Sequence, residues 1–267
     1  MSRYLRTRAR RMAGTEDYTA RPSPRPTGTE GWRVVAGMAT HGPRIATADL
    51  PILSIARQVD VLHVVLNGER YVPDHLPRLP NVRYHADGSD LGARAKLYHL
   101  TDIDAEAAFG VDDDLLYPHD YVSHSLALLQ TDPGSTYCYH GVRLNERYDT
   151  YRQSRAVWSG LRGLSGEPVR VHVLGTGTCF WSPHHALGGG PRWDDSPWPV
   201  RIDTPTGHRV WQRGGRVLCP PRRDPWIRAH RHADKACSIV RMTSEDPSDI
   251  DRYVLEHGVH RLLLEAL

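Results

Sequence analysis

Short apolar runs alternate with stretches of helical period over the first half of the chain, and this alternation constrains the fold more than any other feature. Runs with strand character occupy residues 32–41, 60–68, 81–86, 107–111 and 135–141. Apolar residues at helical spacing occupy residues 44–59, 91–100 and 122–129. Strands that alternate with helices through short connections form a parallel sheet with both faces covered. The sequence therefore predicts an α/β fold with a mainly parallel central sheet flanked by helices.

The chain of 267 residues is long enough for one large α/β domain, and we interpret it as a single domain with three parts. Residues 1–31 are rich in Arg, Pro, Thr and Gly, and we expect a disordered basic arm. Contact of this arm with an acidic lipid surface or a partner is the alternative. Residues 32–141 carry the regular alternation, and residues 142–267 combine Gly- and Pro-rich segments with a final helix over 246–267.

Composition excludes several classes of protein. The net charge is only +3, from 34 Lys and Arg against 31 Asp and Glu, whereas a nucleic-acid-binding protein usually has a stronger and more clustered excess. No apolar run approaches the roughly 20 residues that span a bilayer, and the N-terminus lacks the apolar core of a secretory signal. The four cysteines form no CxxC pair. We therefore expect a cytoplasmic protein with reduced thiols and no transmembrane segment.

Three consecutive aspartates, Asp112, Asp113 and Asp114, follow the apolar run at residues 107–111. Three adjacent carboxylates repel each other, and in parallel sheets ligands bind at the carboxyl ends of the strands. Mg²⁺ or Mn²⁺ would supply the missing positive charge, because such ions bind one or two carboxylates together with phosphate oxygens. Side chains alternate along an extended backbone, so we expect Asp112 and Asp114 to share one face while Asp113 faces away. The alternative is a solvated acidic loop that caps the next helix.

The segment VDDDLLYPHDYV at residues 111–122 resembles the DxD segment of glycosyltransferases with the GT-A fold, particularly bacterial family-2-like members. In that family a strand ends in acidic residues, followed by an apolar pair, Tyr-Pro and a helix. Residues 38–68 resemble the opening strand, first helix and second strand of the same family, and residues 87–100 resemble its Gly-x-x-x-Lys segment. The resemblance covers residues 31–141.

The resemblance implies a metal-dependent enzyme that moves a sugar from a UDP- or GDP-sugar donor to a carbohydrate or natural-product acceptor, with inversion at the anomeric carbon. The donor residues that it implies are Thr40 and Arg44 at the base and ribose, Asp87 near the base, Arg94 and Lys96 near the diphosphate, and Asp112 and Asp113 at the ribose or donor sugar. Asp114 would hold the metal, with Asp112 also near it. We expect Asp113→Asn to be the mildest substitution among the three aspartates.

The second half matches the family less closely. Its Gly-rich segment implies acceptor contacts at Gly175 and Gly177, with Trp181 stacking on a sugar; the alternative for Trp181 is a buried core residue. Asp194, Asp195 and Asp203 compete as the general base that deprotonates the acceptor, and we rank Asp203 above Asp195 because a helical pattern follows it. A late histidine implies a further metal ligand at His232, with His230 as the alternative and a surface pair as the simpler reading.

Two other functions remain open. A sugar nucleotidyltransferase would share the metal and the architecture, but the segment GMATHGPR is a poor version of the Gly-rich phosphate loop that such an enzyme needs. A non-catalytic nucleotide- or sugar-binding module would keep the scaffold without turnover.

Overall fold

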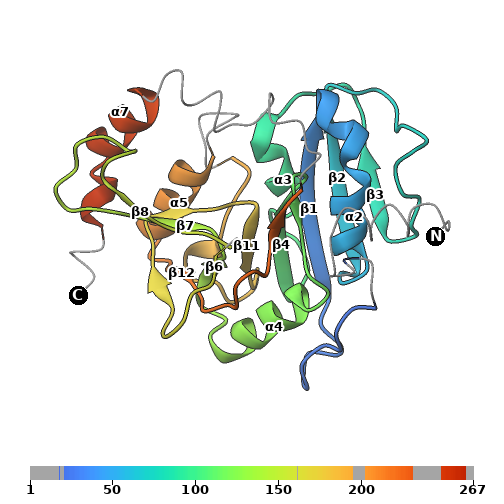
Figure 1. The fold of residues 1–267 in the computed structure, drawn as a ribbon, viewed down its shortest axis with the longest axis horizontal. Helices are drawn as coiled ribbons and strands as arrows, with labels where there is room; N and C mark the ends of the chain where they lie inside the picture. The colour runs from blue at the N-terminus through green and yellow to red at the C-terminus, as the bar shows by residue number, and fades with distance from the viewer. Residues whose placement is uncertain (1–17, 19–20, 161, 195–201, 231–247, 263–267) are drawn as a thin grey trace.

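The computed structural model describes residues 18, 21–160, 162–194, 202–230 and 248–262. Within them an eight-stranded central sheet has the order β3-β2-β1-β4-β11-β6-β12-β9 (Figure 1). Its strands are β1 (Val34–His41), β2 (Val61–Asn67), β3 (Val82–His85), β4 (Ala107–Asp112), β6 (Thr136–Cys138), β9 (Val169–Arg170), β11 (Thr178–Trp181) and β12 (Val217–Cys219).

The four strands from the first half of the chain form a parallel block. β1 pairs in parallel with both β2 and β4, and β2 pairs in parallel with β3. Beyond β4 the sheet is mixed, because β11 runs antiparallel to β4 and β6, and β9 runs antiparallel to β12. The predicted α/β architecture is confirmed, with an antiparallel strand from the Gly-rich segment inserted beside the strand that carries the aspartates.

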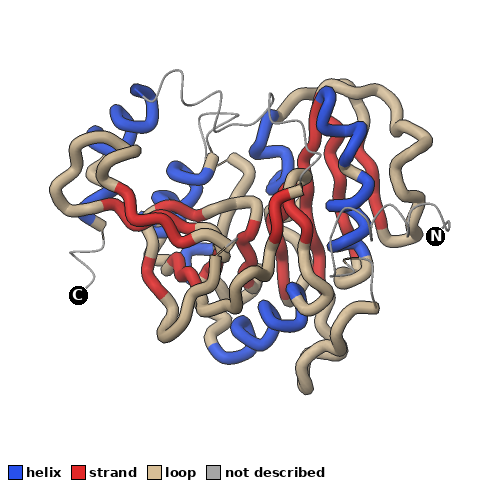
Figure 2. Tube along the Cα trace, in the orientation of Figure 1, coloured by secondary structure: helices blue, strands red, loops and turns tan. Residues whose placement is uncertain are grey.

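Helices cover both faces of the sheet, as Figure 2 shows. On one face α2 (Asp49–Ala56) and α4 (Tyr121–Thr131) pack against alternate residues of β1, β2 and β4. On the other face α3 (Ala95–Tyr98) and α5 (Asp203–Gln212) pack against the sheet residues that point to that face. The short helices η1 (Gly42–Thr47) and η2 (Gly92–Arg94) precede α2 and α3, and Pro51 lies in the first turn of α2, where proline is tolerated.

Two smaller sheets and a C-terminal helix complete the described fold. β7 (Gly141–Leu144), β8 (Arg155–Trp158) and β10 (Val173–Leu174) form one sheet, and β5 (Leu115–Leu116) pairs with β13 (Arg228–Ala229). α7 (Ser248–Glu256) and η5 (Val259–Arg261) pack against the three-stranded sheet through Tyr253, Val254 and Val259. η3 (Leu187–Gly189) follows β11. The predicted final helix is present but shorter, because Gly258 adopts a left-handed conformation after α7.

The body of the protein begins earlier than residue 32. Residues 21–31 lie against the fold: the Ser23 N–H donates to the His119 carbonyl over 3.0 Å, and Arg25 pairs with Asp60 over 2.9 Å. The buried ring of Tyr18 packs with Leu50 and Leu116. The expected disordered arm therefore does not extend to residue 31, and its remainder lies outside the described residues. None of the helices in the described part of the chain is long and apolar enough to cross a membrane.

Candidate active site

The aspartate cluster, Asp112–Asp114, lies where β4 ends. Asp112 is the last residue of that strand and pairs in register with Ala39 of the neighbouring β1. Thr40 comes one residue further along β1, and Arg44 follows in η1, so both side chains lie at the same edge of the sheet. The carboxyl ends of two adjacent parallel strands thus bring acidic and basic groups together.

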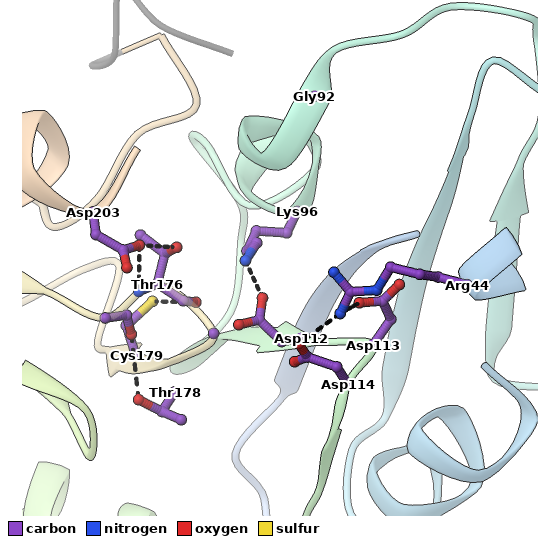
Figure 3. Close-up of polar contacts among 12 residues, drawn as sticks. Arg44, Gly92, Lys96, Asp112, Asp113, Asp114, Thr176, Thr178, Cys179 and Asp203 are labelled. Atoms are coloured by element: carbon purple, nitrogen blue, oxygen red, sulfur yellow. Dashed lines mark hydrogen bonds and ion pairs between the residues drawn. The ribbon is translucent and has the colours of Figure 1, made fainter. Parts of the chain in front are cut away.

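A single buried arginine pairs with two of the three carboxylates (Figure 3). Nη2 of Arg44 lies 2.6 Å from Oδ1 of Asp113 and 2.7 Å from Oδ2 of Asp114. The Asp113 side chain is only 4% exposed and is the most buried of the three. Asp112 and Asp114 are the exposed pair and Asp113 is the buried one, but Arg44 joins Asp113 to Asp114. Strand alternation ends at Asp112, and the turn that begins at Asp113 directs both later carboxylates toward Arg44.

The third carboxylate has a separate partner. The ammonium group of Lys96, on α3, is 7% exposed and forms an ion pair with Oδ1 of Asp112. Burial lowers the pKa of Lys96, but Asp112 and then Asp203 raise it, and the net shift is upward, so the side chain is a buried cation. Gly177 packs directly against this carboxylate, because a Cβ at that position would overlap Oδ2 of Asp112.

Tyr117 fixes the backbone of the cluster, and the sequence analysis did not identify it. Its buried hydroxyl accepts the Asp112 N–H over 2.7 Å and donates to the Gly177 carbonyl over 2.6 Å. Burial raises its pKa well above the usual value, so the phenol keeps the proton that it donates. The hydroxyl therefore joins the end of β4 to the turn before β11. A tyrosine three residues after an acidic cluster, within an otherwise apolar segment, is the sequence signal that could have found it.

The charges of the cluster are not balanced by the protein groups nearest to it. Three carboxylates face two cations, Arg44 and Lys96. Burial raises the pKa of Asp113 to about 7, although Arg44 opposes the shift. Burial and, next, the charge of Asp112 raise the pKa of Asp114. The Asp114 and Asp112 side chains are 38% and 34% exposed, so hard carboxylate oxygens face solvent beside one another. This donor set fits Mg²⁺ or Mn²⁺, which prefer such ligands.

Asp203 is held at the start of α5, on the other side of Lys96 from the cluster (Figure 3). Its Oδ1 accepts the backbone N–H of Thr176 over 3.0 Å and the hydroxyl of the same residue over 2.6 Å. Among the described residues no hydrogen bond engages Oδ2. Of its competitors, Asp194 is exposed near Arg192, with 3.6 Å between their charged groups, and Asp195 lies outside the described residues.

The glycines of the Gly-rich segment lie in close contact with other parts of the protein, whereas we expected them to let the backbone approach a sugar. Gly175 and Gly177 are buried in the turn before β11, and a Cβ on Gly175 would overlap the carbonyl of His140. These glycines therefore permit close packing within the protein. Trp181 lies at the far end of β11, paired with Ala108, and is 1% exposed. No face of its indole is free to stack on a sugar, so the buried-core alternative describes it.

The remaining predicted donor residues lie at the border of the site. Asp87 is in the loop after β3, where its carboxylate accepts the Ser89 N–H over 2.8 Å. The guanidinium of Arg94 lies 5.7 Å from the ring centre of Trp193, which is a cation–π contact. A cavity of about 320 Å³ near Trp181 is lined by residues such as Asp102 and Arg192 and includes none of the aspartate cluster.

The late histidine segment returns to the aspartate cluster. β13 pairs antiparallel with β5, and the N–H of His230 donates to the carbonyl of Asp114 over 2.6 Å. The His230 side chain is buried. His232 lies two residues beyond, outside the described residues.

Comparison with known proteins identifies the fold. No protein-family model and no curated protein sequence matches the chain. Among solved structures, the chain is similar to GalNAc-T7 crystallised with UDP, GalNAc and Mn²⁺, at a TM-score of 0.52 and 11% sequence identity. The match covers 99% of this chain and 65% of that one, so the chain spans less than two thirds of the protein that it resembles. At this identity the likeness concerns the fold alone, and the fold is that of the GT-A glycosyltransferases.

Proposed function

We propose that the protein is a metal-dependent glycosyltransferase that moves a sugar from a nucleotide-sugar donor to an acceptor hydroxyl with inversion. The observation that carries this proposal is the aspartate cluster at the carboxyl end of β4, held by Arg44 and Lys96 within a GT-A fold. GalNAc-T7, which has a similar fold, was crystallised with UDP and Mn²⁺, and this supports a nucleotide and a divalent metal as ligands of the present protein.

In this proposal Asp114 and Asp112 hold Mg²⁺ or Mn²⁺, and the segment that carries His232 supplies a further ligand. A bound divalent metal would offset the negative charge of the donor diphosphate as it departs. Arg44 fixes the orientation of Asp114, and Lys96 fixes that of Asp112, so both carboxylates are oriented before the donor arrives. Such preorganisation avoids reorganisation at the moment of reaction. Thr40, Asp87 and Asp113 complete the nucleotide side of the site, with Arg94 at its border.

We assign the general base to Asp203. Thr176 holds Oδ1 through two hydrogen bonds, and this leaves Oδ2 to accept the proton of the acceptor hydroxyl. The deprotonated oxygen attacks the anomeric carbon from the face opposite the departing diphosphate, and the transition state has oxocarbenium character. Lys96 lies close enough to both Asp112 and Asp203 for the two carboxylates to raise its pKa, so this cation links the aspartate cluster to the assigned base.

A turnover screen tests the proposal. The protein is incubated with Mn²⁺, a panel of UDP- and GDP-sugars and mixed carbohydrate acceptors, and release of nucleoside diphosphate is measured. We expect release that depends on metal and is lost in Asp114→Asn and Asp203→Asn. Asp74→Asn is the matched control, because Asp74 is an exposed aspartate outside the site. Pyrophosphate release from a nucleoside triphosphate and a sugar phosphate would instead identify a nucleotidyltransferase.

Two further measurements address the finer assignments. NMR of the product should show an anomeric configuration opposite to that of the donor, and a retained configuration would refute Asp203 as the base of an inverting reaction. A crystal soaked with Mn²⁺ and UDP or GDP should show metal at Asp114. Nucleotide bound with metal elsewhere would refute the metal assignment, and metal-dependent nucleotide binding without turnover on any donor would favour the binding module.

A further inference from the structure

A second group of metal-ligating side chains lies apart from the aspartate cluster. His63, His85 and His99 each offer a ring nitrogen, and these nitrogens all lie within 4.8 Å of one another. Nδ1 of His63 is 2.9 Å from Nε2 of His85. The rings of His85 and His99 are stacked with 3.7 Å between their centres. Among the described residues, this three-histidine cluster is the group in which three such side chains bring their ligand atoms within 4.8 Å of one another.

The sheet and one helix create this cluster. Val65 pairs in register with His85 across β2 and β3, and His63 lies two residues before Val65 on the same face of its strand. α3 covers this face of the sheet, and His99 follows its last residue. Three elements from separate parts of the sequence thus direct imidazoles to one point near the edge strand β3.

The state of the imidazoles suits metal binding. Burial lowers the pKa of His63 to about 4, with the neighbouring His99 as the next cause. Burial also lowers the pKa of His85 to about 4. Neutral imidazoles are the form that binds a metal, and the proton in the hydrogen bond between Nδ1 of His63 and Nε2 of His85 would move to another ring nitrogen when both atoms bind the ion. All three side chains are partly exposed, so an ion can reach them from solvent.

We propose that His63, His85 and His99 bind a zinc ion whose fourth ligand is water. Imidazole nitrogen is a preferred ligand of Zn²⁺, whereas Mg²⁺ and Mn²⁺ prefer oxygen, so this site and the aspartate cluster select different metals. Tetrahedral ligands at the usual Zn–N length are separated by about 3.3 Å. The distances between the nitrogens would change by no more than about 1.5 Å to reach this separation, and the rings, which are stacked with interplanar angles of 15°, 21° and 22°, would turn so that their lone pairs converge on the ion.

The zinc ion would join β2 and β3 to the end of α3. Lys96 lies on α3 one turn before His99, so the site would also fix the helix that holds Lys96 against Asp112. An ion that binds only the folded protein stabilises it according to its concentration relative to the dissociation constant. This stabilisation of the fold does not depend on the proposed glycosyltransferase activity.

Metal binding can be measured directly on the full chain, produced without a polyhistidine tag and stripped with a chelator. Co²⁺ is the spectroscopic probe, Zn²⁺ is the competitor, and saturating Mg²⁺ blocks the aspartate cluster. We expect Co²⁺ to develop the visible absorption of a four-coordinate nitrogen site, Zn²⁺ to displace it one for one, and Zn²⁺ to raise the melting temperature. His85→Gln and His99→Gln should each lower zinc affinity by at least about tenfold.

The control is His257→Gln, because His257 lies after α7 at the opposite end of the molecule from β3 (Figure 1). It should bind zinc like the wild type. Both cluster variants replace partly exposed side chains, and their metal-free melting temperatures establish that they fold. Equal zinc affinity in the wild type, His85→Gln and His99→Gln would overturn the proposal, as would six-coordinate Co²⁺ spectra; the cluster would then be a stack of neutral rings without a metal.

Discussion

The pair formed by Lys96 and Asp112 provides the most quantitative test of how the site is held together. Lys96 is nearly fully buried, and Asp112 is the carboxylate with which it pairs. Asp112→Asn removes the negative charge and leaves a buried ammonium group. Lys96→Met removes the buried cation and leaves a carboxylate that is 34% exposed and can gain water. The two single substitutions should therefore have unequal effects.

Breaking a buried ion pair costs about 3–5 kcal/mol when one charge remains buried. Asp112 is partly exposed and Asp203 stays near Lys96, so the loss should be smaller than this range. We expect Asp112→Asn to lower the free energy of unfolding by about 2–3 kcal/mol. Lys96→Met should cost about 1 kcal/mol, because the remaining carboxylate hydrates. The double variant should be more stable than the sum of the single losses predicts by about 1–2 kcal/mol.

Urea denaturation of the wild type, the two single variants and the double variant gives these free energies of unfolding. EDTA is present throughout, so that bound metal makes no contribution. The control cycle uses Arg216 and Asp132, whose groups lie 3.0 Å apart but are both more exposed than Lys96. Its coupling should be about 0.5 kcal/mol or less. A coupling between Lys96 and Asp112 no larger than that of the control pair would refute the argument that the protein itself holds this carboxylate in place.

Three further substitutions test neighbouring features. Gly177→Ala should displace the Asp112 carboxylate and weaken Mn²⁺ binding, measured by calorimetry, at least about tenfold. Gly31→Ala is the control, because a Cβ there lies in open space, and it should leave Mn²⁺ binding unchanged. Asp113→Asn should change the melting temperature more than Asp114→Asn, because its side chain is 4% exposed against 38%, and equal changes would contradict this ranking. Burial lowers the pKa of His172 to about 4, below an unfolded value of 6.5, so its contribution to stability is present above pH 6.5 and is lost as the pH falls toward 4. The loss between pH 7.5 and pH 5 should be about 2 kcal/mol, and a pH profile in His172→Asn as steep as that of the wild type would exclude His172 as its source.

The local pattern of the sequence was enough to predict the parallel block and the position of the aspartate cluster. β1, β2 and β4 are apolar runs that end in polar residues, and buried parallel strands have this pattern regardless of their partners. The insertion of β11 between β4 and β6 could not be predicted in the same way. Its four residues are paired with strands far away in the sequence, and the turn before it depends on overlaps that only Gly175 and Gly177 avoid.

The partners of the charged residues were the least predictable part of the site. Arg44 and Lys96 were expected near the donor because of the resemblance, but their ion pairs with the aspartate cluster arise from tertiary structure. Strand alternation could not predict that Arg44 contacts both Asp113 and Asp114, because these two residues belong to a turn. The three-histidine cluster was missed for a related reason: each histidine is unremarkable in its own segment, and only the register of β2 with β3 brings two of them together.

The contacts around Tyr117 connect these observations. One hydroxyl joins the backbone of Asp112 to the turn that contains Gly177, and the N–H of the same tyrosine donates to Oγ of Ser54 on α2 over 3.2 Å. The end of β4 is thus tied to helices and strands on both sides of it, in addition to its ion pairs. A cluster of like charges can remain in one arrangement only if such contacts fix the backbone, because the repulsion between carboxylates would otherwise separate them. The sequence records the charges plainly, whereas the buried hydroxyl that fixes their positions is visible only once the chain has folded.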